Sequence, residues 1–530
     1  MGTAPQVAGG AWIYELMPIY GIGLPYTQRD VSMTHTTQLI CTGCMEKYSL
    51  EEEYRPCQKC GGPLLLDYDL KDISGKLARS SFKDRGWGVW RYLELLPSIN
   101  ERRIISLGEG GTGLLKCERL ARTLGLGRLL IKDETTNPTG SFLDRGMTVH
   151  ISRANELGFR SVRCLADSGN FAASASAYAA RAGFNCTIHS PREKIETLNL
   201  GKLYQIIAYG GNLVVEKLPA DYLELSTVNQ KFYTLSPNNP YFAEGEKTAA
   251  YEICEQLGWR TPDRIVVPMG HGEHLSMIWR GIKELRNLGL VSDQEVAMTG
   301  VQVESYAEIV NQLHSGKTTA QSVGKTKTVA TDLAMKKPTH GYLAIRSIKE
   351  SKGDGITVKD DQVLEAMSLL ARMEGIFAEP AAASTIAGLK KLIDQGQVEQ
   401  TEEVVCVITG AGLKDPLTAR RFIGKVRAVD KIVTQAESRR LTTRLGRTKL
   451  EILKAISNKE TYGYEIWRIM KRRLGVDLDT SSVYQHLSEL EKVGLIKRAK
   501  VESVLGKPDR YYYHLSDRGK AILRSAKTQE

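Results

Sequence analysis

The middle of the chain alternates short apolar runs with longer amphipathic stretches. The clearest apolar runs are RLLIKDE (128–134), SVRCLAD (161–167), NCTIHS (185–190), RIVVPMG (264–270) and EEVVCVITG (402–410). Runs of this length predict β-strands, and the helical patterns between them predict crossovers that join parallel strands. Because crossover helices cover both faces of such a sheet, residues 70–429 are predicted to form an α/β domain with a parallel sheet at its centre.

The pattern changes in the last part of the chain, residues 441–530. Three amphipathic helices are predicted at KLEILKAIS (449–457), YGYEIWRIMKRRLG (462–475) and SSVYQHLSELEKVG (481–494). Two strands follow, LIKRAKVE (495–502) and RYYYHLS (510–516), and a last helix begins at Asp517. Three helices followed by a β-hairpin predict a winged helix-turn-helix. The polar segment 430–440 is predicted to be the linker before it.

Four of the nine cysteines are clustered near the start of the chain. CTGC at 41–44 and CQKC at 57–60 are separated by twelve residues. Two such pairs supply four thiolates for a tetrahedral Zn²⁺, with Cys41, Cys44, Cys57 and Cys60 as ligands. Four sulfurs leave no open coordination position, so residues 33–69 are predicted to be a structural zinc ribbon rather than a catalytic metal site. The alternative is that the four thiols are simply unmodified.

Length and composition narrow the class of protein. A chain of 530 residues exceeds the size of a single hydrophobic core. No apolar run reaches the roughly 18 residues that a membrane helix needs, and residues 1–32 lack the pattern of a signal peptide. We treat residues 1–32 as an extension of uncertain structure. Nine cysteines are too few for a disulfide scaffold, so the composition favours a reducing compartment, the cytoplasm.

Positive charge is concentrated at the end of the chain. The formal net charge is +11, but residues 417–530 hold 26 Lys and Arg against 13 Asp and Glu, so the rest of the chain is slightly negative. A basic segment attached to a near-neutral body indicates a polyanionic partner for that segment. Together with the predicted winged helix, this favours double-stranded DNA.

One stretch in the middle of the chain carries a specific resemblance. IKDETTNPTGSFLDRGM (131–147) resembles the signature of the threonine synthase family, which are fold-type II enzymes that use pyridoxal phosphate. Four further motifs agree with it: SLGEGGTGLL (106–115), DSGNFAASASAYAARAG (167–183), GIFAEPAAAST (375–385) and VITGAGLKDP (407–416). The resemblance covers roughly residues 40–425. It implies a two-lobed core like that of the tryptophan synthase β subunit, and such proteins often carry an N-terminal zinc ribbon.

The resemblance also identifies the cofactor positions, and one of them has changed. In the family, a lysine between Phe142 and Asp144 forms the Schiff base, but this chain has Leu143. An isobutyl side chain has no nitrogen, so it forms no aldimine. The resemblance further places Asn170 at the cofactor's ring oxygen and Thr409 at its pyridine nitrogen. Gly270 and Gly272 are expected in the phosphate loop.

A second change falls in that phosphate loop. Glu273 stands where relatives have a small residue, and a carboxylate would repel the phosphate unless it turned outward or His271 or His274 compensated its charge. Lys132 and Lys414 also occur in relatives, so neither is an obvious replacement nucleophile. We therefore expect no covalent pyridoxal phosphate at position 143, and we treat even non-covalent binding as doubtful.

The last part of the chain resembles the PadR family of transcription regulators, through YGYEIW, SSVYQHLSELEKVGLI and RYYYHLSDRG. In a winged helix the third helix enters the major groove and the wing lies over the adjacent backbone. Candidate DNA contacts on the third helix are Thr480, Ser481, Ser482, Tyr484 and Gln485. Candidate contacts on the wing are Lys497, Arg498, Lys500, Lys507 and Arg510. Leu487, Leu490 and Val493 follow at helical spacing and are expected in the core.

These observations favour a DNA-binding transcription regulator. Its threonine synthase-like domain would be catalytically inactive and would serve as a sensor for a small-molecule effector, such as an amino acid or a phosphorylated amino acid, or as a dimerisation scaffold. Relatives of both parts form dimers, so a homodimer that reads a palindrome is expected. Two alternatives remain: a pyridoxal phosphate-dependent lyase with an attached DNA-binding domain, and a regulatory partner of an active paralogue.

Overall fold

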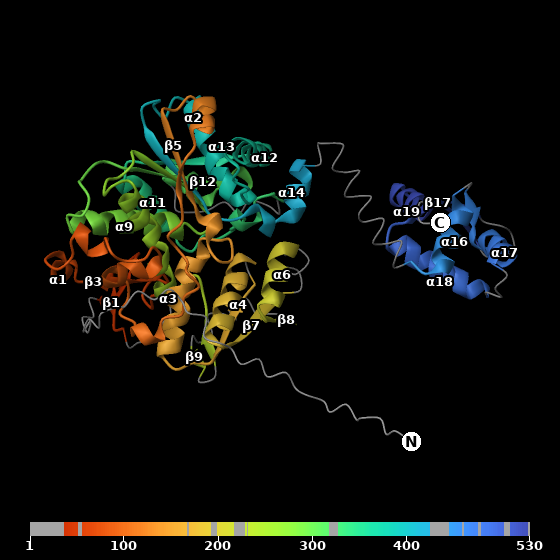
Figure 1. The fold of residues 1–530 in the computed structure, drawn as a ribbon, viewed down its shortest axis with the longest axis horizontal. Coiled ribbons are helices and arrows are strands. Elements are labelled where there is room, and N and C mark those ends of the chain that lie inside the picture. Colours follow the sequence, from red (N-terminus) through yellow and green to blue (C-terminus); the bar gives the residue numbers. More distant parts are fainter. Residues whose placement is uncertain are drawn as a thin grey trace, which may run out of the picture.

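The computed structural model describes residues 36–50, 56–166, 169–191, 199–216, 228–229, 232–316, 327–423, 445–457, 460–474, 479–502 and 509–527. Figure 1 shows the fold coloured along the sequence. The predicted N-terminal extension 1–32, the predicted linker 430–440 and the wing residue Lys507 lie outside the described residues. The domain boundaries given above stay predictions.

A small antiparallel sheet contains the clustered cysteines. Its strands are β1 (Thr36–Cys41), β2 (Lys47–Tyr48) and β3 (Leu64–Tyr68), in the order β2-β1-β3. Strand β3 packs on the main domain, where Leu65 contacts the buried side chains of Ala243 and Met277. The ammonium of Lys247 lies 4.1 Å from the centre of the Tyr68 ring. The sheet is therefore anchored on the main domain by both apolar and cation–π contacts.

The larger lobe of the main domain is built on a six-stranded sheet in the order β13-β12-β11-β14-β5-β4. All neighbouring strands are parallel except β4 and β5. The strands are β4 (Leu114–Lys116), β5 (Arg128–Asp133), β11 (Arg264–Pro268), β12 (Ala297–Val303), β13 (Asp354–Val358) and β14 (Glu403–Ile408). A hydrophobic core lies on each face of this sheet.

Helices cover both faces, as Figure 1 shows. One core receives side chains from α2 (Glu118–Leu124), α12 (Asp360–Leu369) and α13 (Pro380–Asp394). The other receives them from α1 (Leu70–Ser74), α8 (Thr248–Gln256), α9 (Glu273–Asn287), α10 (Glu308–Ser315) and α11 (Gly341–Glu350). Helix α14 (Pro416–Ile423) follows β14 after a short turn, η8 (Gly412–Lys414). The predicted parallel sheet with helices on both faces is confirmed.

The smaller lobe has a five-stranded sheet in the order β8-β7-β6-β10-β9. Its strands are β6 (Ser161–Leu165), β7 (Asn185–Pro191), β8 (Asn212–Glu216), β9 (Val228–Asn229) and β10 (Phe232–Thr234). Its helices are α3 (Leu143–Glu156), α4 (Asn170–Ala182), α6 (Leu200–Ala208) and α7 (Pro240–Glu246). All five apolar runs singled out in the sequence form strands of the two sheets. The two-lobed α/β fold expected from the resemblance is confirmed.

A fully buried group of four charges joins the two lobes. Arg145 on α3 donates from Nε to Oε2 of Glu134 at 2.6 Å and from Nη2 to Oε2 of Glu252 at 2.7 Å. Lys132 Nζ donates to the same Glu252 oxygen at 2.7 Å and to the Thr112 carbonyl at 2.8 Å. All four charged side chains are 0% exposed. Burial alone would raise the pKa of Glu252, but the charges of Arg145 and Lys132 lower it below its ordinary value.

The C-terminal part is a winged helix. Helices α16 (Arg447–Ile456), α17 (Gly463–Leu474) and α18 (Thr480–Lys492) precede the hairpin of β16 (Ile496–Glu502) and β17 (Arg510–Leu515), and α19 (Asp517–Lys527) follows. A short strand that the sequence did not predict, β15 (Thr461–Tyr462), pairs with β17. The expectation that Val493 is buried is wrong. Helix α18 ends at Lys492, and Val493 is 48% exposed, whereas Leu487 and Leu490 are buried.

We predict that replacing Arg145 with methionine lowers the free energy of unfolding by about 3–5 kcal/mol. The substitution keeps most of the volume but leaves Glu134 and Glu252 buried with one counter-charge. Chemical denaturation measures the loss. Arg346→Ala is the control, because this half-exposed arginine pairs with the partly exposed Glu350 four residues later, and its loss should cost less than about 1 kcal/mol. Equal stabilities of the two variants would contradict the prediction.

Candidate ligand cleft, metal centre and nucleic-acid interface

The sequence-predicted cofactor residues lie where strands end and helices begin. Leu143 begins α3, Asn170 begins α4, and Thr409 directly follows β14. The loop with Gly270 and Gly272 joins β11 to α9. In open α/β sheets this edge, outside the carboxyl ends of the strands, is the usual ligand-binding crevice. The structure thus gathers the predicted residues at one edge, although their roles stay predictions.

Leu143 sits between residues that hold the fold. Its side chain is partly buried and packs on the apolar core between α3 and α4. The Asp144 carboxylate accepts hydrogen bonds from Thr139 N at 2.7 Å and from Ser174 Oγ at 2.6 Å. The Phe142 amide donates to the Thr409 carbonyl at 3.0 Å. The neighbours of position 143 are therefore fixed by contacts that need no lysine there.

The two lysines weighed from sequence are already engaged by protein groups. Lys132 belongs to the buried charge group. Lys414 Nζ donates to the Thr139 carbonyl and to Gln205 Oε1, both at 2.6 Å. Each ammonium thus has a structural partner, which supports the view that neither replaces the missing amine.

The sequence reasoning missed a third lysine, Lys202 on α6, which is 2% exposed. Its Nζ lies 2.6 Å from Asp332 Oδ2 and 3.0 Å from Glu379 Oε1. Asn170 Nδ2 donates to Glu379 Oε2 at 2.9 Å, so Lys202 shares a carboxylate with the predicted cofactor residue. Helical spacing could have predicted its burial, because Lys202 lies four residues before Ile206 and the two side chains form the buried face of α6.

Lys202 is held as an ammonium. Burial alone would lower its pKa, but the charges of Asp332 and Glu379 raise it above its ordinary value. Lys202 is thus engaged by two carboxylates and is not presented as a free amine.

In the phosphate loop, Glu273 points inward. Its side chain is 8% exposed and lies at the first position of α9, 3.7 Å from His340 Nε2. Burial and the charge of Glu246 raise the pKa of Glu273 well above its ordinary value. Gly272 has φ +89°, and a Cβ there would lie 2.7 Å from Ala344 Cβ and 3.2 Å from the His340 carbonyl. Close packing of residues 340–344 thus requires this glycine whether or not a ligand binds.

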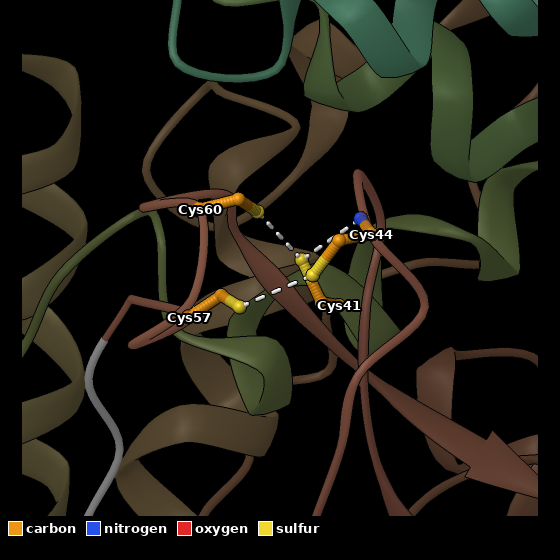
Figure 2. Close-up of side chains that lie close together, drawn as sticks. All are labelled: Cys41, Cys44, Cys57 and Cys60. Carbon is orange, nitrogen blue, oxygen red and sulfur yellow. Dashed lines mark hydrogen bonds between the residues drawn. The ribbon is translucent and has the colours of Figure 1, made fainter.

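The four clustered cysteines converge in the N-terminal sheet, as Figure 2 shows. Their sulfurs all lie within 4.8 Å of one another. The two pairs have matching turns. The amides of Cys41 and Cys57 each donate a hydrogen bond to the carbonyl of the residue five positions later. The amides of residues 45 and 61 donate in turn to the carbonyls of Cys41 and Cys57. Met45 and Gly61 both have positive φ. A Cβ on Gly62 would lie 3.2 Å from Cys41 Sγ, so glycine leaves room around the sulfurs. The donor set fits a structural Zn²⁺.

The winged helix presents the predicted third-helix residues at the start of α18. Thr480, Ser481, Tyr484 and Gln485 are exposed, and Ser482 is half-buried. Asp479 caps the helix by accepting a hydrogen bond from Ser482 N at 2.7 Å. On the wing, the Arg498 guanidinium lies 4.8 Å from the centre of the Tyr511 ring and pairs with Glu491 at 2.9 Å. Lys497 and Lys500 are exposed on β16, and Arg510 lies over Tyr462.

Comparisons with known proteins agree with this architecture. Residues 105–410 match the family described as pyridoxal-phosphate dependent enzyme. The chain belongs to this family. Residues 452–525 match the PadR-like family of transcriptional regulators.

Curated relatives are threonine synthases. The chain is 42% identical over 385 residues to threonine synthase of Methanocaldococcus jannaschii. The aligned region covers 72% of this chain and 94% of that protein. It is 40% identical over 384 residues to threonine synthase of Methanosarcina acetivorans, covering 72% and 93%. Diaminopropionate ammonia lyase from Escherichia coli superimposes with a TM-score of 0.50 at 16% identity, over 62% of this chain and 95% of that chain. That likeness shows the fold alone.

The cofactor of the pyridoxal-phosphate dependent family does not fit this cleft as a covalent ligand. Leu143 offers no amine, and Lys202 is held between two carboxylates. At the predicted phosphate loop, the buried Glu273 carboxyl lies at the start of α9.

We predict about one Zn²⁺ per chain, bound by Cys41, Cys44, Cys57 and Cys60. Replacing Cys57 with serine leaves three thiolates and should abolish stoichiometric metal binding, which elemental mass spectrometry measures. Replacing the buried Cys186 with alanine is the control and should leave the metal content unchanged. A metal-free wild-type protein, or full zinc content in the Cys57 variant, would contradict the prediction.

Proposed function

We propose that this protein is a DNA-binding transcription regulator whose threonine synthase-like domain is catalytically inactive and binds a small-molecule effector. The PadR-like domain is that of a transcriptional regulator. The observation that carries the inactivity is Leu143, which occupies the position of the Schiff-base lysine in a motif that is otherwise intact. Without an amine at that place the covalent step has no nucleophile.

The arrangement of the winged helix supports contact with DNA. The start of α18 offers short hydroxyl and amide side chains, which suit phosphate and base-edge contacts, and the exposed wing lysines suit phosphates. Lys507 and Arg510 belong to the same proposed wing contacts. In this proposal the protein is a homodimer, and its two winged helices read half-sites about one helical turn apart.

Polar groups beside the predicted cofactor residues support the sensing role. One hydrogen-bonded and ion-paired group contains Asn170, Lys202, Glu379 and Asp332. No described helix is long and apolar enough to span a bilayer. With cysteine usage that favours a reducing compartment, we propose that the protein acts in the cytoplasm.

The regulator function and the competing lyase function predict opposite results for DNA binding and phosphate release by the same purified protein. Selection from a random DNA pool at low salt should enrich a palindromic site, and the wild-type chain with added pyridoxal phosphate should release no phosphate from a phosphorylated amino acid. Absence of any enriched sequence would refute the regulator. Sustained phosphate release would refute the inactivity and establish the lyase alternative.

We predict separable effects for the wing and the third helix. Lys497→Ala should weaken binding to all DNA sequences alike and reduce the salt dependence of affinity by about one unit of slope. Gln485→Ala should instead change the base preference within each half-site. Fluorescence anisotropy at several salt concentrations measures both. Lys390→Ala, an exposed lysine paired with Glu365 in the main domain, is the control and should change neither property.

A further inference from the structure

A buried cluster of acids and imidazoles lies at the start of α9. Three elements supply it: Glu246 ends α7, Glu273 and His274 begin α9, and His340 directly precedes α11. Their exposed fractions are 1%, 7%, 6% and 1%, respectively. The His274 ring packs on Phe142, with centroids 4.2 Å apart, so the cluster adjoins position 143.

The cluster leaves several polar atoms unsatisfied. Atoms without a hydrogen-bond partner among the described residues are Glu246 Oε2, Glu273 Oε1, both ring nitrogens of His274 and His340 Nε2. His274 Nδ1 lies 3.3 Å from Glu246 Oε2, and His340 Nε2 lies 3.7 Å from Glu273 Oε1, so each carboxyl faces an imidazole without a well-aligned hydrogen bond. Buried polar groups in folded proteins nearly always have partners, so several such atoms together indicate a binding site.

The electrostatics of this site oppose a phosphate. A helix N-terminus is a usual place for a bound anion, and in this chain the buried Glu273 side chain occupies the first position of that helix. Burial lowers the pKa of His340 to about 3, so this imidazole brings no positive charge to the cluster. Burial also raises the pKa values of Glu246 and Glu273, so these carboxyl groups resist carrying charge in this site. A dianionic phosphate would therefore be buried beside two carboxyl groups and an uncharged imidazole, with no cation from His340 to balance its charge.

We propose that this loop excludes phosphate, and that the cleft takes a phosphate-free ligand whose end group donates hydrogen bonds to Glu246 and Glu273. A hydroxyl, amide or ammonium group would satisfy the orphaned carboxyl oxygens that a phosphate cannot. The proposal narrows the effector to this chemical class, and in that respect it rests on the proposed sensing function. The phosphorylated amino acids considered from the sequence are then excluded as effectors.

Three ligands that differ at one carbon test the proposal without DNA. 5′-Deoxypyridoxine, pyridoxine and pyridoxine 5′-phosphate share one ring and carry a methyl, a hydroxymethyl and a phosphate ester at the same position. None is an aldehyde, so binding is non-covalent. Calorimetry with the full-length chain should rank pyridoxine first and the phosphate ester last, at least tenfold weaker.

Glu273→Gly should reverse that order, because it removes the carboxyl and restores a small residue to the loop. Glu273→Gln, which keeps the volume but replaces the acid with an amide that donates hydrogen bonds and cannot ionise, should restore part of the phosphate binding. Glu308→Gly is the matched control, because Glu308 is also a buried glutamate at the first position of a helix, α10. This control should leave the order unchanged.

A covalent reporter covers the case in which the wild-type cleft binds none of the three ligands. In Leu143→Lys, attack of the new amine on the aldehyde of pyridoxal phosphate forms an imine with loss of water, which gives a visible absorbance band. The single variant should need at least tenfold more pyridoxal phosphate than Leu143→Lys/Glu273→Gly.

The outcomes show whether the loop discriminates against phosphate or accepts it as readily as a hydroxyl group. Tight binding of pyridoxine 5′-phosphate by the wild-type chain would overturn the proposal. So would equal imine formation in the single and double lysine variants. Neither result bears on DNA binding, so failure of this proposal leaves the regulator function to its own test.

Discussion

The buried group of Lys132, Glu134, Arg145 and Glu252 is the constraint on which the two-lobed domain depends. Its ion pairs connect Lys132 on β5 of the larger sheet and Arg145 on α3 of the smaller lobe to Glu252 on α8. Two positive and two negative side chains balance one another without solvent, so loss of any one leaves an uncompensated charge. Folding therefore depends on several residues close to position 143, whether or not the domain is an enzyme.

Position 143 itself is free of that constraint. Asp144 and Arg145 are bound by hydrogen bonds and ion pairs, but the Leu143 side chain only packs on a neighbouring apolar core. The contacts that stabilise the fold are thus made by Asp144 and Arg145, whereas a covalent link to a cofactor would depend on position 143. A leucine at position 143 therefore costs the fold little, because the contacts of Asp144 and Arg145 do not involve its side chain.

The pattern of apolar residues predicted the strands of the fold well, because a parallel sheet that is buried on both faces requires continuous apolar runs in its strands. It failed where tertiary contacts decide. Strand β15 is two residues long and exists only by pairing with β17. Val493 keeps the helical spacing but follows the last residue of α18, so it turns outward.

The same limit applies to the cleft. The motifs identified Asn170, Thr409 and the phosphate loop, because a resemblance transfers positions along the chain. They did not reveal Lys202, whose ion partners Asp332 and Glu379 lie more than a hundred residues away. Nor did they reveal that Glu273 turns inward towards Glu246, since the sequence left its side-chain direction open.

The cysteine-bearing sheet contacts two helices that supply the acid and imidazole cluster, because Leu65 on β3 packs with Ala243 of α7 and with Met277 of α9. Strand β3 packs on α7, and Tyr68 at the end of β3 lies over the ammonium of Lys247, which pairs with Glu244 and Glu284. Glu246, a member of the acid and imidazole cluster, is the last residue of that helix. A bound Zn²⁺ would fix the sheet, the sheet holds α7, and α7 sets the position of one of the two carboxyl groups at the loop. The metal site and the ligand cleft are therefore parts of one packed unit, although about two hundred residues separate Cys41 from Glu246 in the sequence.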